Sequence, residues 1–304
     1  MIGPEFLNRI VFGCGNIGGL GSSPSLRDKG DSREQGLALL DHARALGLTR
    51  FDTANTYGGG VSEQVLGEWL KRQDPAWRAG VQVASKVGNP NGCPPGDTPL
   101  SRRQVAEHLD RSLQRLGVER IDLYYIHEFD HVTPLAETLE AFDRALAAGK
   151  IAAFGVSNAT LDDLRSVLAL TGDGALRAAF TTVQNEFNLL RQCDLAAVVP
   201  LAAAEGLSYV AFSPLAGGLL TGKYRPGGQA AAGTRAGDAP QFFADLMTPQ
   251  AFDAVAALGR DADTRGWTLP AAALRFILDQ PGDLSLIVAP RSIEQFDGYG
   301  VGAG

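Results

Sequence analysis

The sequence predicts an α/β protein of the (β/α)8, or TIM-barrel, class, folded as a single domain. Eight short stretches have the continuous hydrophobicity of strands that are buried on both faces. A helix-sized segment separates most of these strands, and a glycine repeatedly ends the helix before the next strand begins. Strict alternation indicates a parallel sheet, and eight units favour a closed barrel. An open, doubly wound sheet is the alternative.

Sequence signals at both ends of the helices support this alternation. The glycines that end helices are Gly47, Gly117, Gly149 and Gly206, which we expect in the left-handed conformation. Ser32 with Gln35 and Ser101 with Gln104 fit capping boxes at helix starts, and Pro134 is expected at the first position of another helix. The strands are expected at residues 9–12, 49–53, 81–86, 121–127, 151–156, 180–184, 208–212 and 284–288.

The two ends of the chain depart from the regular repeat. Residues 217–248 are rich in Gly, Ala and Pro and predict a long loop, followed by helices at 249–265 and 270–279. The glycine-rich residues 298–304 cannot form a good helix, so we expect the eighth helix to be truncated. Residues 1–6 are interpreted as a cloning remnant, which leaves the barrel domain at 7–304.

Composition excludes several classes of function. A net charge of −7 over 304 residues disfavours nucleic acid and anionic membranes as partners. Cys14, Cys93 and Cys193 lie far apart, with neither the spacing of metal ligands nor an even count for disulfides. The sequence contains no membrane-length apolar run and no signal peptide pattern. We therefore expect a cytoplasmic protein without a metal, of bacterial origin because Arg and Ala are abundant.

The segment from Gly13 to Gly18 matches the dinucleotide-binding pattern G-x-G-x-x-G but lacks its context. That motif requires a helix to begin at once and an acidic residue about 20 positions later. Here a polar stretch follows instead. We interpret the segment as a loop at the barrel mouth, where Gly15 and Asn16 come close to a ligand.

Four chemically reactive side chains stand at or just after consecutive strands: Asp52 and Tyr57 after the second, Lys86 on the third and His127 on the fourth. Taken singly, each has an ordinary structural explanation. The carboxyl ends of barrel strands meet at one face, where active sites form, so the four are expected to converge. The Lys86 cation is expected to lower the pKa of Tyr57 toward the working range, while Asp52 keeps Lys86 charged. His127 would orient a substrate oxygen.

Such a site moves a proton to or from an oxygen, and it has neither a nucleophile with an adjacent base nor a metal cluster. Reduction of a carbonyl would therefore require hydride from a cofactor.

The chain resembles the aldo-keto reductase superfamily from about Arg9 to Gln295. The motifs that carry the resemblance are Phe51-Asp52-Thr53-Ala54 with Tyr57-Gly58, Ala84-Ser85-Lys86, Tyr124-Tyr125-Ile126-His127, Gly155-Val156-Ser157-Asn158, Gln184-Asn185-Glu186-Phe187-Asn188, Phe212-Ser213-Pro214-Leu215 and Gly222-Lys223-Tyr224.

The resemblance implies a catalytic tetrad of Asp52, Tyr57, Lys86 and His127 and a site for NADP(H). It implies that Ser157, Asn158 and Gln184 hold the nicotinamide carboxamide and that Phe212 stacks on the ring. Ser213, Leu215, Gly217 and Lys223 would surround the pyrophosphate, and Arg291 and Ser292 would bind the 2′-phosphate. Gly15, Asn16 and Gln295 complete the expected cofactor set. Tyr299 stands where relatives often place an asparagine for adenine.

The expected function is NADP-dependent reduction of an aldehyde or ketone, or the reverse oxidation, on a small-molecule substrate by a monomer or homo-oligomer. Two alternatives stay open. A Schiff-base aldolase would use Lys86 as its amine, which would leave Ser157, Asn158 and Gln184 without a role. A non-catalytic, cofactor-sensing regulatory subunit would bind the same cofactor without turnover.

Overall fold

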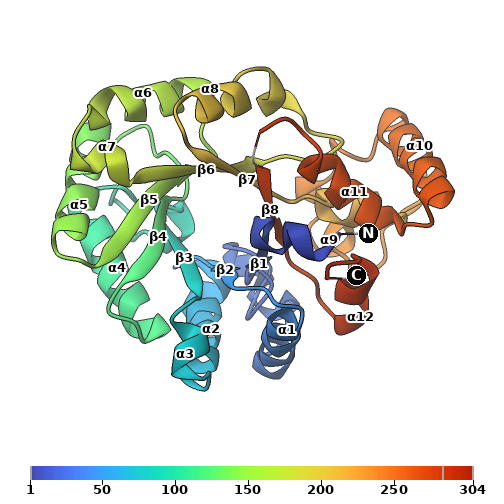
Figure 1. Cartoon of the computed structure of the whole chain (residues 1–304), viewed down its shortest axis with the longest axis horizontal. Coiled ribbons are helices and arrows are strands. Elements are labelled where there is room, and N and C mark those ends of the chain that lie inside the picture. The colour runs from blue at the N-terminus through green and yellow to red at the C-terminus, as the bar shows by residue number, and fades with distance from the viewer. Residues whose placement is uncertain (1, 283, 303–304) are drawn as a thin grey trace.

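The computed structural model describes residues 2–282 and 284–302, and within them the chain closes into an eight-stranded parallel barrel (Figure 1). Each strand pairs with its neighbours in sequence, and β8 returns to pair with β1. The expected strands are confirmed to within two residues at each end. They are β1 (Ile10–Gly13), β2 (Arg50–Asp52), β3 (Gln82–Val87), β4 (Ile121–Ile126), β5 (Ile151–Ser157), β6 (Phe180–Glu186), β7 (Ser208–Phe212) and β8 (Leu284–Val288).

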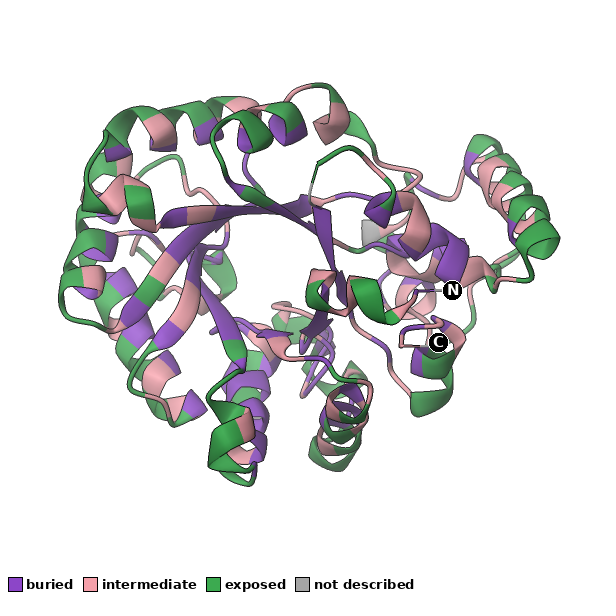
Figure 2. Cartoon of the chain, viewed as in Figure 1, coloured by how far each residue is buried: buried purple, intermediate pink, exposed green. Residues whose placement is uncertain are grey.

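The helices surround the barrel and turn apolar faces toward it, so buried residues line their inner sides (Figure 2). The α-helices are α1 (Arg33–Ala45), α2 (Val61–Lys71), α3 (Pro75–Arg78), α4 (Arg102–Leu116), α5 (Leu135–Ala147), α6 (Leu161–Thr171), α7 (Ala175–Ala179), α8 (Val198–Ala204), α9 (Arg235–Asp238), α10 (Pro249–Arg265), α11 (Leu269–Leu278) and α12 (Ile293–Gly298). Short 3-10 helices include η2 (Pro24–Lys29), η3 (Tyr57–Gly60) and η6 (Ala216–Thr221). Helix α10 stands at the edge of the molecule in Figure 1.

The helix signals in the sequence are largely confirmed. The four helix-ending glycines all have φ between 65° and 88°. Ser32 and Gln35 form a full capping box on α1, whereas Gln104 of α4 turns its side chain to Asp97, so Ser101 makes only half of one. Pro134 caps α5 instead of occupying its first turn. Helix α10 has the expected bounds, and the expected helix at 270–279 lies one residue earlier.

The two chain ends lie together. Ile2 is fully buried and pairs with Val301, and residues Pro4–Arg9 form a 3-10 helix beside β1 and β8. The origin of residues 1–6 as a cloning remnant stays a prediction, but Ile2 contributes to the hydrophobic core. The last described helix, α12, is six residues long, in agreement with the truncated eighth helix expected from the glycines after it. Residues 303–304 of that expectation lie outside the described residues.

Candidate active site

The four expected tetrad residues meet at the carboxyl ends of β2, β3 and β4. Asp52 ends β2, Lys86 lies on β3, His127 follows β4, and Tyr57 begins η3. All except Tyr57 are less than a tenth exposed, and Lys86 is completely buried. The parallel register places Asp52 beside Ala84 and Lys86 beside Tyr125, which brings strands far apart in sequence to one edge.

Lys86 is the centre of this group. Its ammonium donates hydrogen bonds to Asp52 Oδ1, to the carbonyl oxygen of Thr53 at 2.9 Å and to the Tyr57 hydroxyl at 3.2 Å. Burial lowers the pKa of Lys86, but the combined influence of the adjacent Asp52 carboxylate and of Tyr57 exceeds this lowering, so that the pKa is raised above its ordinary value. Lys86 is therefore a fixed cation, as expected from the sequence.

Tyr57 is held by an unusual turn. Gly58 and Gly60 both have positive φ, and a Cβ at either position would come within 3 Å of another atom: the carbonyl oxygen of Ile17 for Gly58, and the guanidinium of Arg115 for Gly60. Only glycine fits there without strain. Burial raises the pKa of Tyr57 above its ordinary value and outweighs the lowering by Lys86. The expectation of a lowered pKa is therefore wrong for this protein, because burial was left out of it.

His127 supplies the fourth group in its neutral form. Burial and the nearby Lys86 cation hold the pKa of His127 well below its ordinary value. Its ring meets that of Tyr57 edge to face, with 5.6 Å between centroids. Within the described residues the Nδ1 atom is buried without a hydrogen-bond partner. Because an orphaned buried polar atom is costly, it indicates a place for a ligand or an ordered water.

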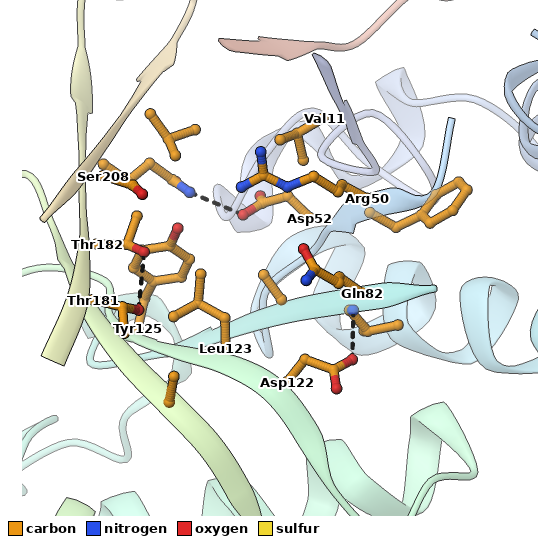
Figure 3. Close-up of a pocket in the computed structure, with 16 residues that line it drawn as sticks. Val11, Arg50, Asp52, Gln82, Asp122, Leu123, Tyr125, Thr181, Thr182 and Ser208 are labelled. Atoms are coloured by element: carbon orange, nitrogen blue, oxygen red, sulfur yellow. Dashed lines mark hydrogen bonds between the residues drawn. The ribbon is translucent and has the colours of Figure 1, made fainter. Parts of the chain in front are cut away.

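Gln184 joins the tetrad from β6. Its side-chain amide donates to Asp52 Oδ2 at 2.9 Å, so both oxygens of that carboxylate are hydrogen-bonded. Below this contact a cavity of about 250 Å³ extends inside the barrel to the amino-terminal ends of the strands. Arg50, Asp52 and Tyr125 lie around it in Figure 3. Polar and apolar side chains both line the cavity, and Asp52 is among the polar ones.

Backbone strain gathers at the neighbouring strand ends. Asn158, Ser213 and Ala216 follow β5 and β7 with φ of 53°, 51° and 47°. Such conformations are costly for residues other than glycine, and they cluster at ligand sites. The Asn158 amide donates to the carbonyl oxygen of His127 at 2.9 Å, which ties the expected nicotinamide-binding residues to the tetrad.

The other residues expected to contact the nicotinamide and the pyrophosphate differ from one another in burial and in their neighbours. Ser157 is buried and accepts from the Asn158 amide at 3.3 Å, while Phe212 is partly buried and packs against the small cluster of Val11, Val210 and Ile287. Leu215 is buried in the core. The loop glycine Gly217 has φ of 63° and contacts the Phe243 ring so closely that no side chain would fit. Lys223 lies over the ring of Tyr224, 5.2 Å from its centroid.

A second polar group, here called the arginine cluster, consists of Asn16, Asp31, Arg235 and Arg291. Asn16 is buried, donates to the carbonyl oxygen of Ala289 at 2.9 Å and accepts from Arg235. Arg235 comes from the loop at 217–248 and Asp31 follows η2, and neither residue was predicted from the sequence as part of the site. Gly15, also expected here, faces the ring of Tyr57.

Arg291 donates hydrogen bonds both within this cluster and to neighbouring backbone carbonyl groups. Its guanidinium donates to Asp31 Oδ1 at 3.0 Å and to the carbonyl oxygens of Lys29 and Gly233 at 3.0 and 3.1 Å. Ser292 caps α12, where its hydroxyl accepts a hydrogen bond from the backbone N–H of Gln295. The side-chain oxygen of Gln295 in turn accepts from the backbone N–H of Arg291 at 3.0 Å. The cluster thus connects the first loop, the long loop and α12.

An ion pair near Tyr57, between buried Glu63 and partly exposed Arg115, was also not predicted from the sequence. Glu63 on α2 is fully buried, accepts from the Ser85 hydroxyl at 2.6 Å and pairs with Arg115 at 3.1 Å. Arg115 also donates to the carbonyl oxygen of Asn55 at 3.1 Å. Arg115 therefore links the buried carboxylate of Glu63 to the backbone two residues before Tyr57. No local pattern in the sequence links residues of α2 and α4 in this way.

The part of the chain that the structure describes contains neither a membrane-spanning helix nor a cluster of metal-binding side chains. No helix there has the length and apolar character needed to cross a membrane. No group of three or more His, Cys, Asp or Glu side chains in those residues is arranged to hold a metal ion.

Comparison with known proteins identifies the family. Residues 9–299 match the model of the aldo/keto reductase family. L-glyceraldehyde 3-phosphate reductase of Escherichia coli K12 is 30% identical over 86% of this chain and 76% of its own length. Aldo-keto reductase str7 of Strobilurus tenacellus is 32% identical over 97% of this chain and 84% of its own.

Structural comparison agrees on the fold. A thermostable aldo-keto reductase solved with the inhibitor epalrestat superimposes with a TM-score of 0.71. It covers 96% of this chain and 88% of its own, at 23% sequence identity. The sequence matches, the closed barrel and the geometry at its mouth lead to one conclusion. The chain belongs to the aldo/keto reductase family and is an oxidoreductase of the carbonyl-reducing kind.

Proposed function

We propose that this protein is an NADP-dependent reductase of a small aldehyde or ketone, or a dehydrogenase of the corresponding alcohol, with Tyr57 as general acid. One observation carries the proposal. The Tyr57 hydroxyl lies 3.2 Å from a fixed lysine cation and edge to face with a neutral histidine, at the mouth of the barrel.

The chemistry follows from the charge states of these groups. A bound nicotinamide supplies the hydride that reduces the carbonyl carbon. Tyr57 carries its proton at neutral pH, because the ordinary pKa of a phenol already lies well above neutral and burial raises it further. It can therefore donate this proton to the carbonyl oxygen. Lys86 stabilises the resulting phenolate by its charge, and Asp52 together with Gln184 keeps Lys86 in place. Neutral His127 donates a hydrogen bond that orients the substrate oxygen.

The cofactor assignment rests on residues that suit it. The positive backbone φ of Asn158 and Ser213, which residues other than glycine seldom adopt, supports a ligand-binding site at the strand ends beside the tetrad. Two guanidinium groups, those of Arg235 and Arg291, act on a single buried carboxylate and leave an excess of positive charge for a phosphate. One relative, from Schizosaccharomyces pombe, is named an NADP(+) aldo-keto reductase. We assign the 2′-phosphate to Arg291 and the nicotinamide carboxamide to Ser157, Asn158 and Gln184.

The alternative of a Schiff-base aldolase is disfavoured by the state of Lys86. A Schiff base forms from a neutral amine, whereas Asp52 holds the pKa of Lys86 above its ordinary value. All three hydrogen bonds of the ammonium are also used within the site. A cofactor-sensing subunit would bind NADP(H) through the same residues without turnover. A measurement of substrate turnover therefore distinguishes such a subunit from an enzyme.

We also propose the cytoplasm as the compartment, because the three cysteines are unpaired, and a monomer or homo-oligomer as the working form. Cell fractionation and light scattering would test these two points.

The deciding experiment is a panel of aldehydes, ketones and alcohols, assayed by nicotinamide absorbance with NADPH, NADH, NADP and NAD. We expect turnover of at least one carbonyl with NADPH and slower turnover with NADH. Tight NADPH binding without any turnover would favour the regulatory subunit. Binding of neither cofactor would refute the proposal.

A further inference from the structure

Asp31 is an unusual member of the arginine cluster. Its side chain is only 2% exposed, and one carboxylate oxygen accepts a hydrogen bond from Arg291 at 3.0 Å. The other oxygen, Oδ2, is buried and has no hydrogen-bond partner in the described part of the chain. The backbone of Asp31 is fixed on both sides, because its N–H donates to the Asn16 carbonyl oxygen and its own carbonyl oxygen accepts from Gly18. A rigid, half-satisfied buried carboxylate calls for an explanation.

Two arginines determine the charge environment of Asp31. The charged groups that act on it are Arg291, through a hydrogen bond and its charge, and Arg235, through its charge. Burial raises the pKa of Asp31 above its ordinary value against the lowering by both arginines. An anion that binds Arg291 must therefore enter next to a carboxylate that already occupies that guanidinium.

We infer that Asp31 competes with the cofactor's 2′-phosphate for the guanidinium of Arg291 and thereby sets the preference between NADP(H) and NAD(H). The inference rests on the proposed function, because it takes Arg291 as the residue that receives this phosphate. In the protein without cofactor, Asp31 stands in for the phosphate and keeps Arg291 folded into the cluster. When the phosphate binds, Arg291 turns from the carboxylate to the stronger anion.

This exchange has a consequence for protons. Loss of the Arg291 hydrogen bond and arrival of a phosphate both raise the pKa of Asp31 further, since both disfavour its charged form. Binding of NADPH then takes up a proton, and affinity increases as the pH falls toward the raised pKa. Binding of NADH brings no 2′-phosphate and leaves the contact between Asp31 and Arg291 intact.

The test uses Asp31→Asn, which keeps the shape and an acceptor for Arg291 but removes the charge. Dissociation constants of NADPH and NADH are measured by fluorescence titration of the full-length protein at several pH values. We expect Asp31→Asn to bind NADPH about tenfold more tightly, the low end of one charge-assisted hydrogen bond, with NADH unchanged. The wild type should gain NADPH affinity as the pH falls toward the raised pKa of Asp31, and the variant should show less of this gain.

Asp110→Asn is the matched control, because Asp110 is an exposed carboxylate paired with Lys150 on the outside of the barrel. It removes the same charge and should leave both affinities unchanged. Weaker NADPH binding by Asp31→Asn would show that Asp31 positions Arg291 instead of competing for it, and would overturn the inference. Should the variant fail to fold, a wild-type ratio of NADPH to NADH affinity that does not change with pH would overturn it equally. If the wild type binds neither cofactor, the proposed function itself is wrong.

Discussion

Replacement of Tyr57 by phenylalanine tests the proposed mechanism most directly. The change removes one hydroxyl and keeps the ring, so the edge-to-face contact with His127 and the position of the Lys86 ammonium 4.7 Å from the ring centroid are retained. Lys86 loses its longest hydrogen bond, at 3.2 Å, but keeps those to Asp52 and to the Thr53 carbonyl oxygen. The free energy of unfolding should therefore change by only about 1 kcal/mol.

The effect on turnover should be far larger. General acid catalysis contributes roughly 100- to 10,000-fold, which corresponds to about 3–5 kcal/mol of activation free energy. Tyr57→Phe should lose this factor in kcat for a carbonyl identified in the panel. NADPH affinity should stay within about twofold, because the phenol is assigned to the substrate oxygen and not to the cofactor.

Single-turnover absorbance of NADPH measures the chemical step, fluorescence titration measures cofactor affinity, and thermal unfolding measures stability. Tyr209→Phe is a matched control, since it removes a tyrosine hydroxyl bonded at 2.7 Å to Asp194, away from the tetrad. The control should lose some stability but no catalytic rate. If Tyr57→Phe reduced the carbonyl at a near-normal rate, Tyr57 would not be the acid and the mechanism would need another proton donor.

Four more predictions follow from the same structure. The rate of carbonyl reduction should be level between about pH 7 and pH 9, because burial raises the pKa of Tyr57 and lowers that of His127; a bell centred within this range in a pH–rate profile would contradict it. Arg291→Ala should weaken NADPH binding by about ten- to a hundred-fold and NADH binding little, and equal losses in titrations would refute its assignment to the 2′-phosphate. NADP should protect the loop at 217–240 from limited proteolysis, because we expect this loop to become ordered over the bound cofactor. Cleavage that saturating cofactor leaves unchanged would contradict this ordering. Arg115→Met should cost about 3–5 kcal/mol in denaturant unfolding by leaving the carboxylate of Glu63 buried without its partner, and a smaller loss in Arg115→Lys would attribute that cost to the charge.

The sequence was sufficient for the parts of the site that depend on strand ends. Asp52, Lys86 and His127 each belong to a strand or follow one directly, so the parallel barrel brings them together once the strands are placed. Arg235 and Asp31 could not be found in this way. Their positions depend on the path of long loops, and Arg235 reaches an Asn16 that is 219 positions away.

The pKa of Tyr57 shows a different limit of sequence reasoning. The neighbouring Lys86 is visible in the sequence pattern, and its charge does lower the pKa as expected. The larger influence, burial of the phenol, depends on how completely the surrounding loops cover the site, and this is a property of the folded chain. The direction of a pKa shift is therefore fixed by packing even where the chemically important neighbours are known.

The buried pair of Asp52 and Lys86 bears on how this protein withstands heat. Two charges removed from water carry a desolvation penalty that their attraction does not always repay, and well-packed apolar replacements of such pairs often add about 1–4 kcal/mol of stability. Each kcal/mol shifts the melting temperature by roughly 2–4 °C in domains of about 150–250 residues, and by somewhat less in a larger chain such as this one. Selection for heat resistance alone would therefore favour loss of the pair, whereas selection for turnover would retain it. Under the proposed mechanism, these two residues therefore place catalysis and thermal stability in opposition within one chain.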